Sequence, residues 1–170
     1  MYENEKVLNG KELLMKRRSV REFKDKEVLQ DVLREIFELS RFAPTASNSQ
    51  AYYFVVVTDK KALEELANVR GGSTAPIGRA PMAVAICVDP DKTSRPTEDG
   101  CIAAYHFMLA ARYYSLGTCW MADMDRENIK QALNIPQNHL VATVTPVGYP
   151  VKEPDMPTRK PKEEFIKYSG

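Results

Sequence analysis

Cysteine and histidine are scarce in this sequence, and the few that occur are not grouped. The 170 residues include three cysteines (Cys87, Cys101 and Cys119) and two histidines (His106 and His139). No Cys-x-x-Cys pair or Cys/His cluster occurs, so a zinc site is not expected. An odd number of widely spaced cysteines argues against a disulfide framework and favours a reducing, cytoplasmic setting.

Long apolar runs and an excess of charge are also missing. No apolar stretch approaches the ~20 residues of a membrane-spanning helix, and residues 1–16 lack the apolar core of a signal peptide. The formal net charge is +1, whereas nucleic-acid-binding domains carry a broad positive excess. These absences predict a cytoplasmic protein that binds neither a membrane nor nucleic acid, and any basic site must be local.

Common motifs of nucleotide and hydrolase chemistry are absent too. No Gly-x-Gly-x-x-Gly follows an expected strand, and residues 71–79 have glycines without the spacing of a P-loop. Neither Gly-x-Ser-x-Gly nor His-Glu-x-x-His occurs. Cys101 and His106 are five positions apart and fall on different faces of an expected helix, so they do not form a nucleophile–base pair.

The apolar patterns that are present predict one α+β domain spanning residues 1–170. Strands are expected at residues 52–59, 81–89, 118–124 and 139–150, and helices at residues 10–17, 25–43, 60–70, 99–117 and 125–135. Asp25 and Asp125 are expected to be helix N-caps. The proline-rich residues 151–170 cannot form a core, so we expect an extended arm that packs on something else, often a second subunit.

A basic cluster near the N-terminus has two interpretations. Arg17, Arg18, Ser19 and Arg21 fall within five positions in the stretch MKRRSVREF. They form either a solvated helix end or a site for one small anion, because the planar fork of an arginine suits phosphate. If the chain is extended here, Arg17, Ser19 and Arg21 face the same side. The cluster alone leaves both interpretations open.

Three further segments carry polar or basic groups, and each also has a purely structural interpretation. Residues 44–49 form a polar turn between a helix and a strand, which a capped loop would explain. Residues 115–125 leave a helix at Gly117, with Cys119 and Trp120 expected in the core. Residues 158–165 form a second basic cluster, which a solvated tail would explain.

In their order along the chain, these four segments resemble the nitroreductase family of FMN-dependent oxidoreductases. The matching stretches are RRSVREF, APTASNSQ, SLGTCW and the basic arm, and the resemblance extends from about Leu13 to Phe165. It implies a nitroreductase-like α+β fold with a mostly antiparallel central sheet flanked by helices. It also implies a homodimer with FMN at the subunit interface and a C-terminal arm that crosses to the partner subunit.

The resemblance further implies a role for each segment. The first segment would hold the phosphate and ribityl chain, with Arg21 near the pyrimidine edge of the ring. The polar turn would come from the partner subunit, residues 121–122 would place backbone groups near N5, and the arm would close on the phosphate. The full set of implied cofactor-binding residues is Arg17, Arg18, Ser19, Arg21, Pro44, Thr45, Ala46, Asn48, Met121, Ala122, Arg159 and Lys160.

The implied activity is that of a flavin oxidoreductase. NADH or NADPH reduces the bound FMN by hydride transfer to N5, and the flavin then reduces an electron-poor acceptor such as a nitroaromatic or a quinone, in a ping-pong cycle. Because the cofactor carries this chemistry, no side chain is assigned as a nucleophile or general base. The alternative is a flavin-binding storage or redox-sensing protein without efficient turnover.

The sequence also departs from the family pattern. Ala51-Tyr52 stand where relatives often have Pro-Trp, and Asp123 lies in a stretch where many relatives have glycine. Asp123 either places a carboxylate near the flavin, which disfavours the anionic reduced ring, or caps the next helix. Residues 67–80 and 89–98 leave little room for the helical insert that covers the flavin in larger relatives, which predicts an open cleft.

Overall fold

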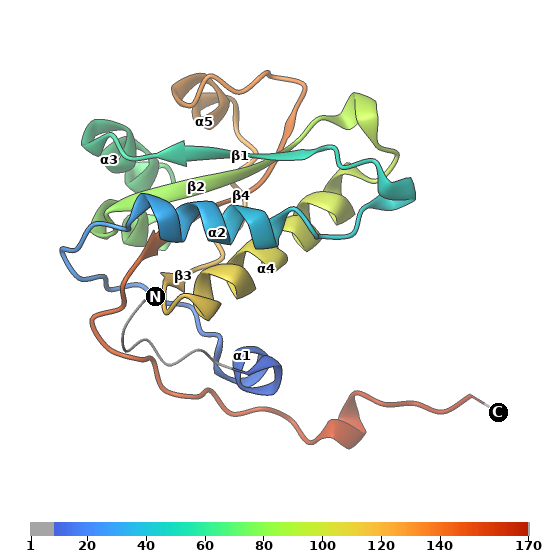
Figure 1. The fold of residues 1–170 in the computed structure, drawn as a ribbon. Helices are drawn as coiled ribbons and strands as arrows, with labels where there is room; N and C mark the ends of the chain where they lie inside the picture. Colours follow the sequence, from blue (N-terminus) through green and yellow to red (C-terminus); the bar gives the residue numbers. More distant parts are fainter. Residues whose placement is uncertain (1–8, 170) are drawn as a thin grey trace.

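The centre of the protein is a four-stranded antiparallel sheet with strand order β1-β2-β4-β3 (Figure 1). A computed structural model describes residues 9–169. The strands are β1 (Tyr52–Val57), β2 (Met82–Val88), β3 (Gly117–Thr118) and β4 (Leu140–Gly148). Every pairing between these strands is antiparallel. The predicted antiparallel central sheet flanked by helices is confirmed.

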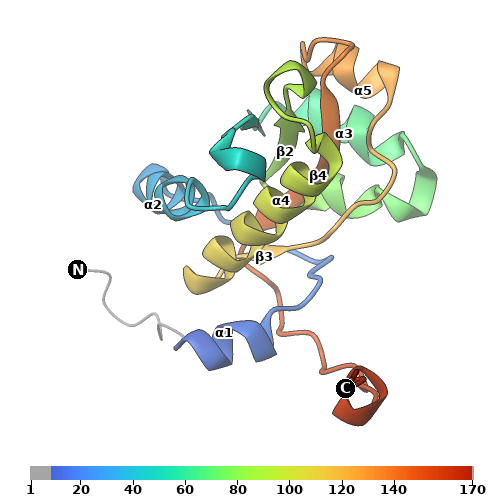
Figure 2. The same ribbon diagram turned by 90° about the vertical axis from the view of Figure 1, so that its right-hand side faces the viewer.

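The central strand β2 is buried along its whole length, as its unbroken apolar sequence predicts. Successive side chains of a strand point to opposite faces. Val84 and Ile86 therefore pack on one face, while Ala83 and Ala85 pack on the other. The helices α2 and α4 lie on the first side of the sheet and α3 and α5 on the second (Figure 2).

All five expected helices are present; four have shorter bounds than the patterns suggest, and the fourth along the chain begins three residues earlier and ends four residues earlier than expected. They are α1 (Gly10–Lys16), α2 (Gln30–Ser40), α3 (Lys60–Asn68), α4 (Pro96–Tyr113) and α5 (Glu127–Ala132). No helix within residues 9–169 has the length and apolar character needed to cross a bilayer. Two 3-10 turns, Gly71–Ser73 and Ala75–Arg79, are the regular structure that joins α3 to β2.

Both predicted N-caps are wrong. Helix α2 begins at Gln30, five residues after Asp25, because Phe23 pairs with Pro150 and Lys24 bonds to the Tyr149 carbonyl, which keeps the chain extended. Asp125 precedes α5 without capping it. Its carboxylate instead accepts a hydrogen bond from the Val141 backbone at 3.0 Å. In both places, contacts with distant segments outweigh the local capping preference.

The strand expected at residues 118–124 is only two residues long. Beyond Thr118 the chain still follows β4, but threonine hydroxyls take the place of backbone carbonyls. The N–H groups of Cys119 and Met121 donate to the side chains of Thr145 and Thr143, each at 3.2 Å. Because residues 119 and 121 face inward, Trp120 faces outward and is 38% exposed, so its expected place in the core is wrong.

The C-terminal residues form an extended arm, as expected. Residues 151–169 contain one short 3-10 turn, Lys162–Glu164, and almost all of their side chains are exposed. The arm leaves the sheet near the end of α4, where Glu153 pairs with Arg112 at 2.7 Å, and runs on past α1 (Figures 1 and 2). Its crossing to a partner subunit stays a prediction.

Candidate functional site

The basic cluster lies directly beside the segment that follows α4. Ser19 forms a parallel bridge with Thr118, and the Val20 N–H donates to the Thr118 carbonyl at 2.9 Å. Glycine is required opposite this contact, since a Cβ on Gly117 would lie 2.7 Å from Val20. Two of the four predicted segments are therefore brought together within one chain.

The extended backbone at this contact places alternate side chains of the cluster on opposite sides. Val20 is buried at 3% exposure, so the neighbours that alternate with it, Ser19 and Arg21, face the other way. Arg17 and Ser19 are half-buried and Arg21 is exposed. Within residues 9–169, the guanidinium groups of Arg17 and Arg21 make no hydrogen bond or ion pair, which leaves their donors available to a ligand.

Arg18 lies apart from this side of the strand. Its Nη1 donates to the Met15 carbonyl at 2.6 Å and to the Arg17 carbonyl at 2.8 Å, so it satisfies carbonyls at the end of α1. It also lines a separate cavity of about 480 Å³ with Arg112 and Glu153, which pair at 2.7 Å. The predicted contact of Arg18 with a phosphate stays a prediction.

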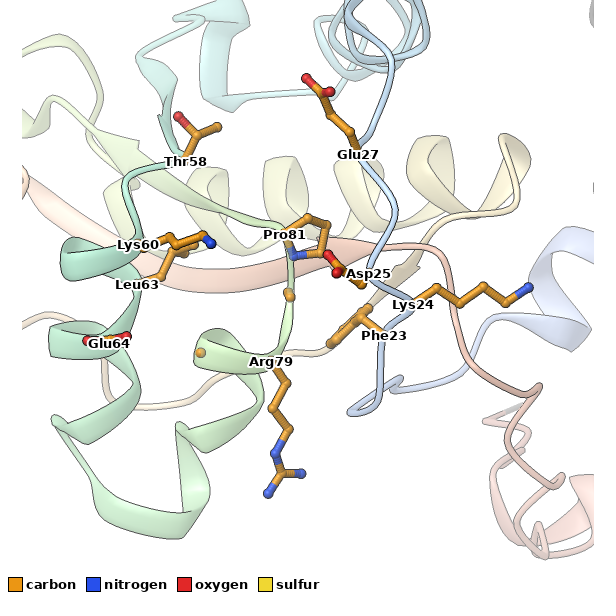
Figure 3. Close-up of a pocket in the computed structure, with 12 residues that line it drawn as sticks. Phe23, Lys24, Asp25, Glu27, Thr58, Lys60, Leu63, Glu64, Arg79 and Pro81 are labelled. Carbon is orange, nitrogen blue, oxygen red and sulfur yellow. The ribbon is translucent and has the colours of Figure 1, made fainter.

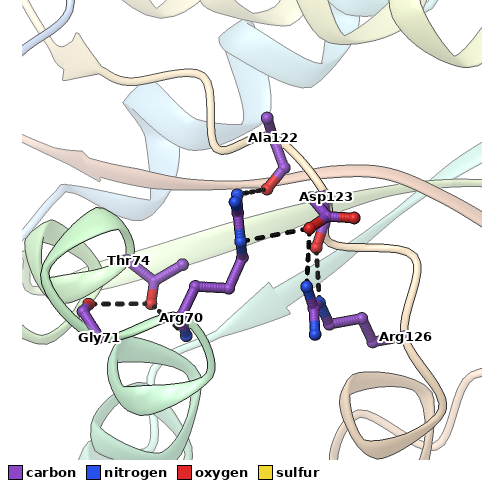
Figure 4. Close-up of polar contacts among 6 residues, drawn as sticks. All are labelled: Arg70, Gly71, Thr74, Ala122, Asp123 and Arg126. Carbon is purple, nitrogen blue, oxygen red and sulfur yellow. Dashed lines mark hydrogen bonds and ion pairs between the residues drawn. The ribbon is translucent and has the colours of Figure 1, made fainter.

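The segment at Met121 and Ala122 is held by two arginines (Figure 4). Arg70 donates to the Ala122 carbonyl at 2.7 Å, and Arg126 donates to the Asp123 carbonyl at 2.9 Å. Met121 is buried and Ala122 is exposed, so the chain reaches the surface at this point.

Asp123 is not a helix cap, since Arg126 occupies the N-cap position of α5. Its carboxylate lies 2.7 Å from Arg126 Nη2 and 3.3 Å from Arg70 Nε. The hydrogen bond from Arg126, together with the charges of both arginines, lowers the pKa of Asp123 below its ordinary value. Asp123 therefore carries a negative charge that two cations offset.

The polar turn before β1 has an unusual backbone. Ser47, Asn48 and Gln50 have φ values of 51°, 54° and 49°. Each such non-glycine residue in the left-handed region costs about 1 kcal/mol or more, and such strain clusters at ligand-binding sites. The sequence gives no sign of these positive φ values, because none of the three residues is glycine.

A buried carboxylate holds the turn in place. Asp99 is 2% exposed and accepts hydrogen bonds from the Ala46 N–H at 2.8 Å, the Ser49 hydroxyl at 3.2 Å and the Thr93 hydroxyl at 2.6 Å. Asp99 lies near the start of α4, so the polar loop of residues 44–49 lies at the N-terminal end of that helix. Sequence reasoning missed Asp99, whose one signal is an acidic residue at an expected helix start.

The turn and the basic cluster lie at opposite ends of α4 (Figure 1). The helix has 18 residues and so a length of about 27 Å at 1.5 Å per residue. The turn is fixed at its first residues, whereas Thr118, the partner of Ser19, follows its last. One flavin ring cannot contact both segments of the same chain.

The fourth predicted segment lies on the arm. Arg159 and Lys160 are exposed, and Lys160 pairs with Glu164 at 3.2 Å. The arm begins close to the basic cluster, since the Val151 N–H donates to the Glu22 carbonyl at 3.1 Å. It therefore starts beside the cluster without bringing its own cations to it.

A further cavity, of about 470 Å³, contains none of the predicted site residues (Figure 3). It lies between the segment before α2, the start of α3 and the segment before β2. Three cations and three carboxylates line it, so it offers no net charge to an anion: Lys24, Lys60, Arg79, Asp25, Glu27 and Glu64. Among residues 9–169, no group of three or more His, Cys, Asp or Glu side chains could hold a metal ion.

The fold and the two adjoining segments define an α+β protein with a local basic edge, and comparisons identify its family. The family model for the nitroreductase family matches residues 14–87 and 70–149. A protein of Archaeoglobus fulgidus, whose name carries both NADH dehydrogenase and NAD(P)H nitroreductase, is 30% identical over 152 residues. The match covers 84% of this chain and 86% of that protein.

Solved structures agree with this match. The structure of an FMN-dependent nitroreductase from Clostridium difficile R20291 is 29% identical to this chain, with a TM-score of 0.82 and coverage of 93% of this chain and 98% of that one. A nitroreductase family protein from Streptococcus pneumoniae TIGR4 is 23% identical, with a TM-score of 0.85 and coverage of 95% and 100%, and shows the same fold. The chain therefore belongs to the nitroreductase family, and the predicted nitroreductase-type fold and oxidoreductase class are confirmed.

Proposed function

We propose that this protein binds FMN and uses NADH or NADPH to reduce small electron-poor acceptors such as nitroaromatics or quinones. The observation that carries the proposal is the bridge between Ser19 and Thr118, which sets the basic cluster beside the start of the segment that leads to Met121 and Ala122. The names of two relatives support FMN: the FMN-dependent nitroreductase above and a Bacillus subtilis NAD(P)H FMN reductase, 30% identical over 82 residues. The described cysteines are free, which supports a cytoplasmic setting.

The donor set fits a phosphate ester. Arg17 and Arg21 offer unpaired guanidinium groups on the side of the strand that also carries the Ser19 hydroxyl. Charge-assisted bonds of this kind are short and strong, and two arginines compensate a phosphate dianion without a P-loop. Arg17 and Ser19 would hold the phosphate and ribityl chain, while Arg21 would face the ring.

FMN supplies the redox chemistry when bound, because its N5 takes a hydride from NAD(P)H and the ring passes the electrons on. Arg21 would place a fixed cation at the pyrimidine edge, where negative charge gathers on reduction. Backbone groups of Met121 and Ala122 would lie near N5. Asp123 does not oppose reduction, because Arg70 and Arg126 offset its charge.

An open site favours a ping-pong cycle with small acceptors. The connection from α3 to β2 contains two short 3-10 turns and no longer helix. Ala122 and Trp120 are both exposed. The nucleotide donor and the acceptor would use the same opening in turn, so the oxidised donor leaves before the acceptor enters.

The active form would be a homodimer with two shared sites. The basic cluster is separated from the polar turn of its own chain by about the length of α4, roughly 27 Å. A second copy would therefore supply the turn that flanks the ring, with Pro44, Thr45, Ala46 and Asn48. An apolar surface for that copy exists beside α4, where Phe42 is 62% exposed. A cavity of about 360 Å³ in this surface is lined by Leu13, Leu39, Phe42, His106, Leu109, Ala110 and Tyr113.

The arm would pack on the second copy. It exposes large apolar side chains that have no core in their own chain, among them Phe165 at 69% and Tyr168 at 94%. Residues 151–159 span about 30 Å when extended. The arm is therefore long enough for Arg159 to reach a phosphate that a basic cluster holds. Lys160 would follow it.

Titration with FMN tests the proposal. Purified protein should retain added FMN through gel filtration, and NADH or NADPH should bleach the visible flavin band under anaerobic conditions. Addition of a nitroaromatic or quinone should then restore the band. Protein that retains no FMN would contradict the proposal, whereas retained FMN that neither nucleotide bleaches would favour the storage or sensing alternative.

A further inference from the structure

Arg70 links two segments that lie 52 residues apart in the sequence. It follows α3, and its side chain reaches the segment before α5 (Figure 4). Its Nη1 donates to the Ala122 carbonyl at 2.7 Å, and its Nε lies 3.3 Å from a carboxylate oxygen of Asp123. One guanidinium therefore holds both a backbone group and a side chain of this segment.

Arg126 holds the same segment through different atoms. Its Nε donates to the Asp123 carbonyl at 2.9 Å, and its Nη2 donates to the Asp123 carboxylate at 2.7 Å. Two successive carbonyls, those of Ala122 and Asp123, are each bound to a guanidinium. The orientation of two successive peptide units is thereby fixed.

The direction of the carbonyl determines the direction of the adjoining N–H. In a trans peptide unit the C=O and the N–H point in opposite directions, and no peptide bond within residues 9–169 is cis. By holding the Ala122 carbonyl, Arg70 directs the Asp123 N–H away from itself. No hydrogen bond among residues 9–169 uses this N–H, so it remains available as a donor.

Stability does not account for this arrangement. The side chains of Arg70 and Asp123 are 31% and 60% exposed, and ion pairs at such positions contribute little to folding. Asp123 has a φ of 62°, which is unfavourable for any residue with a Cβ. Strain of this kind persists where surrounding contacts enforce it, and it is concentrated at functional sites.

We propose that Arg70 is a positioning residue for the reactive edge of the flavin. It fixes the peptide between Ala122 and Asp123 so that the Asp123 N–H is held ready to donate to the ring, and it does not touch the cofactor itself. This inference rests on the proposed function, which places this segment near N5. Thr74 supports the arrangement, since its buried hydroxyl accepts from the Arg70 N–H at 3.0 Å and donates to the Ala67 carbonyl at 2.8 Å.

The test compares Arg70→Met, Arg70→Lys and Arg79→Met. Arg79 is a matched control, because it lies on the same connection to β2, is half-exposed, and pairs with Glu22 away from Ala122. Hydrogen exchange of the amides at residues 122–124 is measured with and without FMN, alongside FMN affinity and the rate of bleaching by saturating NADH. Circular dichroism confirms that each variant folds.

The wild type and Arg79→Met should show slow exchange at these amides once FMN is bound. Arg70→Met should bind FMN within about tenfold of the wild-type affinity, lose this protection, and bleach about tenfold or more slowly. Arg70→Lys should fall between them and serves in place of Arg70→Met if the latter does not fold. Wild-type protection and bleaching rates in both Arg70 variants would overturn the inference, while failure of wild-type protein to bind FMN would overturn the proposed function beneath it.

Discussion

The basic cluster shows how single residues in one short stretch take different roles. Because Val20 is buried in an extended segment, its neighbours Ser19 and Arg21 face outward together. Arg18 instead binds the carbonyls at the end of α1. Composition alone cannot tell which of these arginines faces a ligand, whereas the alternation of side chains along the extended segment can.

Removal of Arg17 should therefore weaken FMN binding more than removal of Arg18. We expect Arg17→Ala to lose about 1.5–3 kcal/mol, the value of a hydrogen bond to a charged group, and Arg18→Ala to lose less. Quenching of FMN fluorescence on binding gives both affinities. Arg34→Ala is a suitable control, since Arg34 is exposed on α2 and pairs with Asp31. Equal affinities for Arg17→Ala and the wild type would remove Arg17 from the site.

The three cysteines should differ sharply in reactivity. Cys87 is fully buried, and burial raises the pKa of its thiol to about 12, so the reactive thiolate is scarce at pH 8. Cys119 is also buried, whereas Cys101 is exposed on α4. A chromogenic disulfide reagent at pH 8 should label Cys101 before the two buried thiols in the native protein, although partial burial and Glu98 raise its pKa, and should label all three after unfolding. Rapid labelling of two or more native thiols would contradict the packing around β2 and β4.

At the scale of elements, periodicity predicted most of the helices and strands, and long-range contacts account for the differences. The apolar run of β2 and the apolar stripe of α2 are local patterns, and each predicts the type of its element and its buried face. The end of β3 depends on Thr143 and Thr145, more than 20 residues away, whose hydroxyls replace backbone acceptors. Asp99 and Arg70 act on segments about 50 residues distant, and no local pattern signals such contacts.

The contact between the basic cluster and β3 depends on the absence of a side chain at Gly117. We expect Gly117→Ala to cost about 1–3 kcal/mol of unfolding free energy, because its Cβ would overlap Val20. It should also weaken FMN binding, since the strand that carries Ser19 must shift. Gly10→Ala is the control, as nothing lies within 4 Å of a Cβ there. Urea unfolding and FMN titration of both variants measure these effects, and an unchanged Gly117→Ala protein would contradict this close approach.

At the scale of the whole molecule, the two ends of α4 carry the two groups of residues that the proposed function assigns to one FMN site. One end has Ser19 and its neighbouring arginines, and the other has the strained turn that Asp99 holds. Neither group would enclose a flavin alone, and the exposed apolar surface beside α4 would give a second copy a place to bind. The family match establishes the fold, while the proposed division of the site between two chains rests on the length of one helix.

A mixed dimer tests this shared site most directly. One subunit carries Arg17→Ala with Arg21→Ala, the other carries Asp99→Ala, and two different affinity tags isolate the heterodimer. Each homodimer should bind FMN poorly. In the heterodimer, a shared site places both lesions in one site and leaves the other intact, so we expect one tightly bound FMN per dimer. If each site were built from a single chain, both sites would carry a lesion, and the absence of tightly bound FMN in the heterodimer would contradict the account.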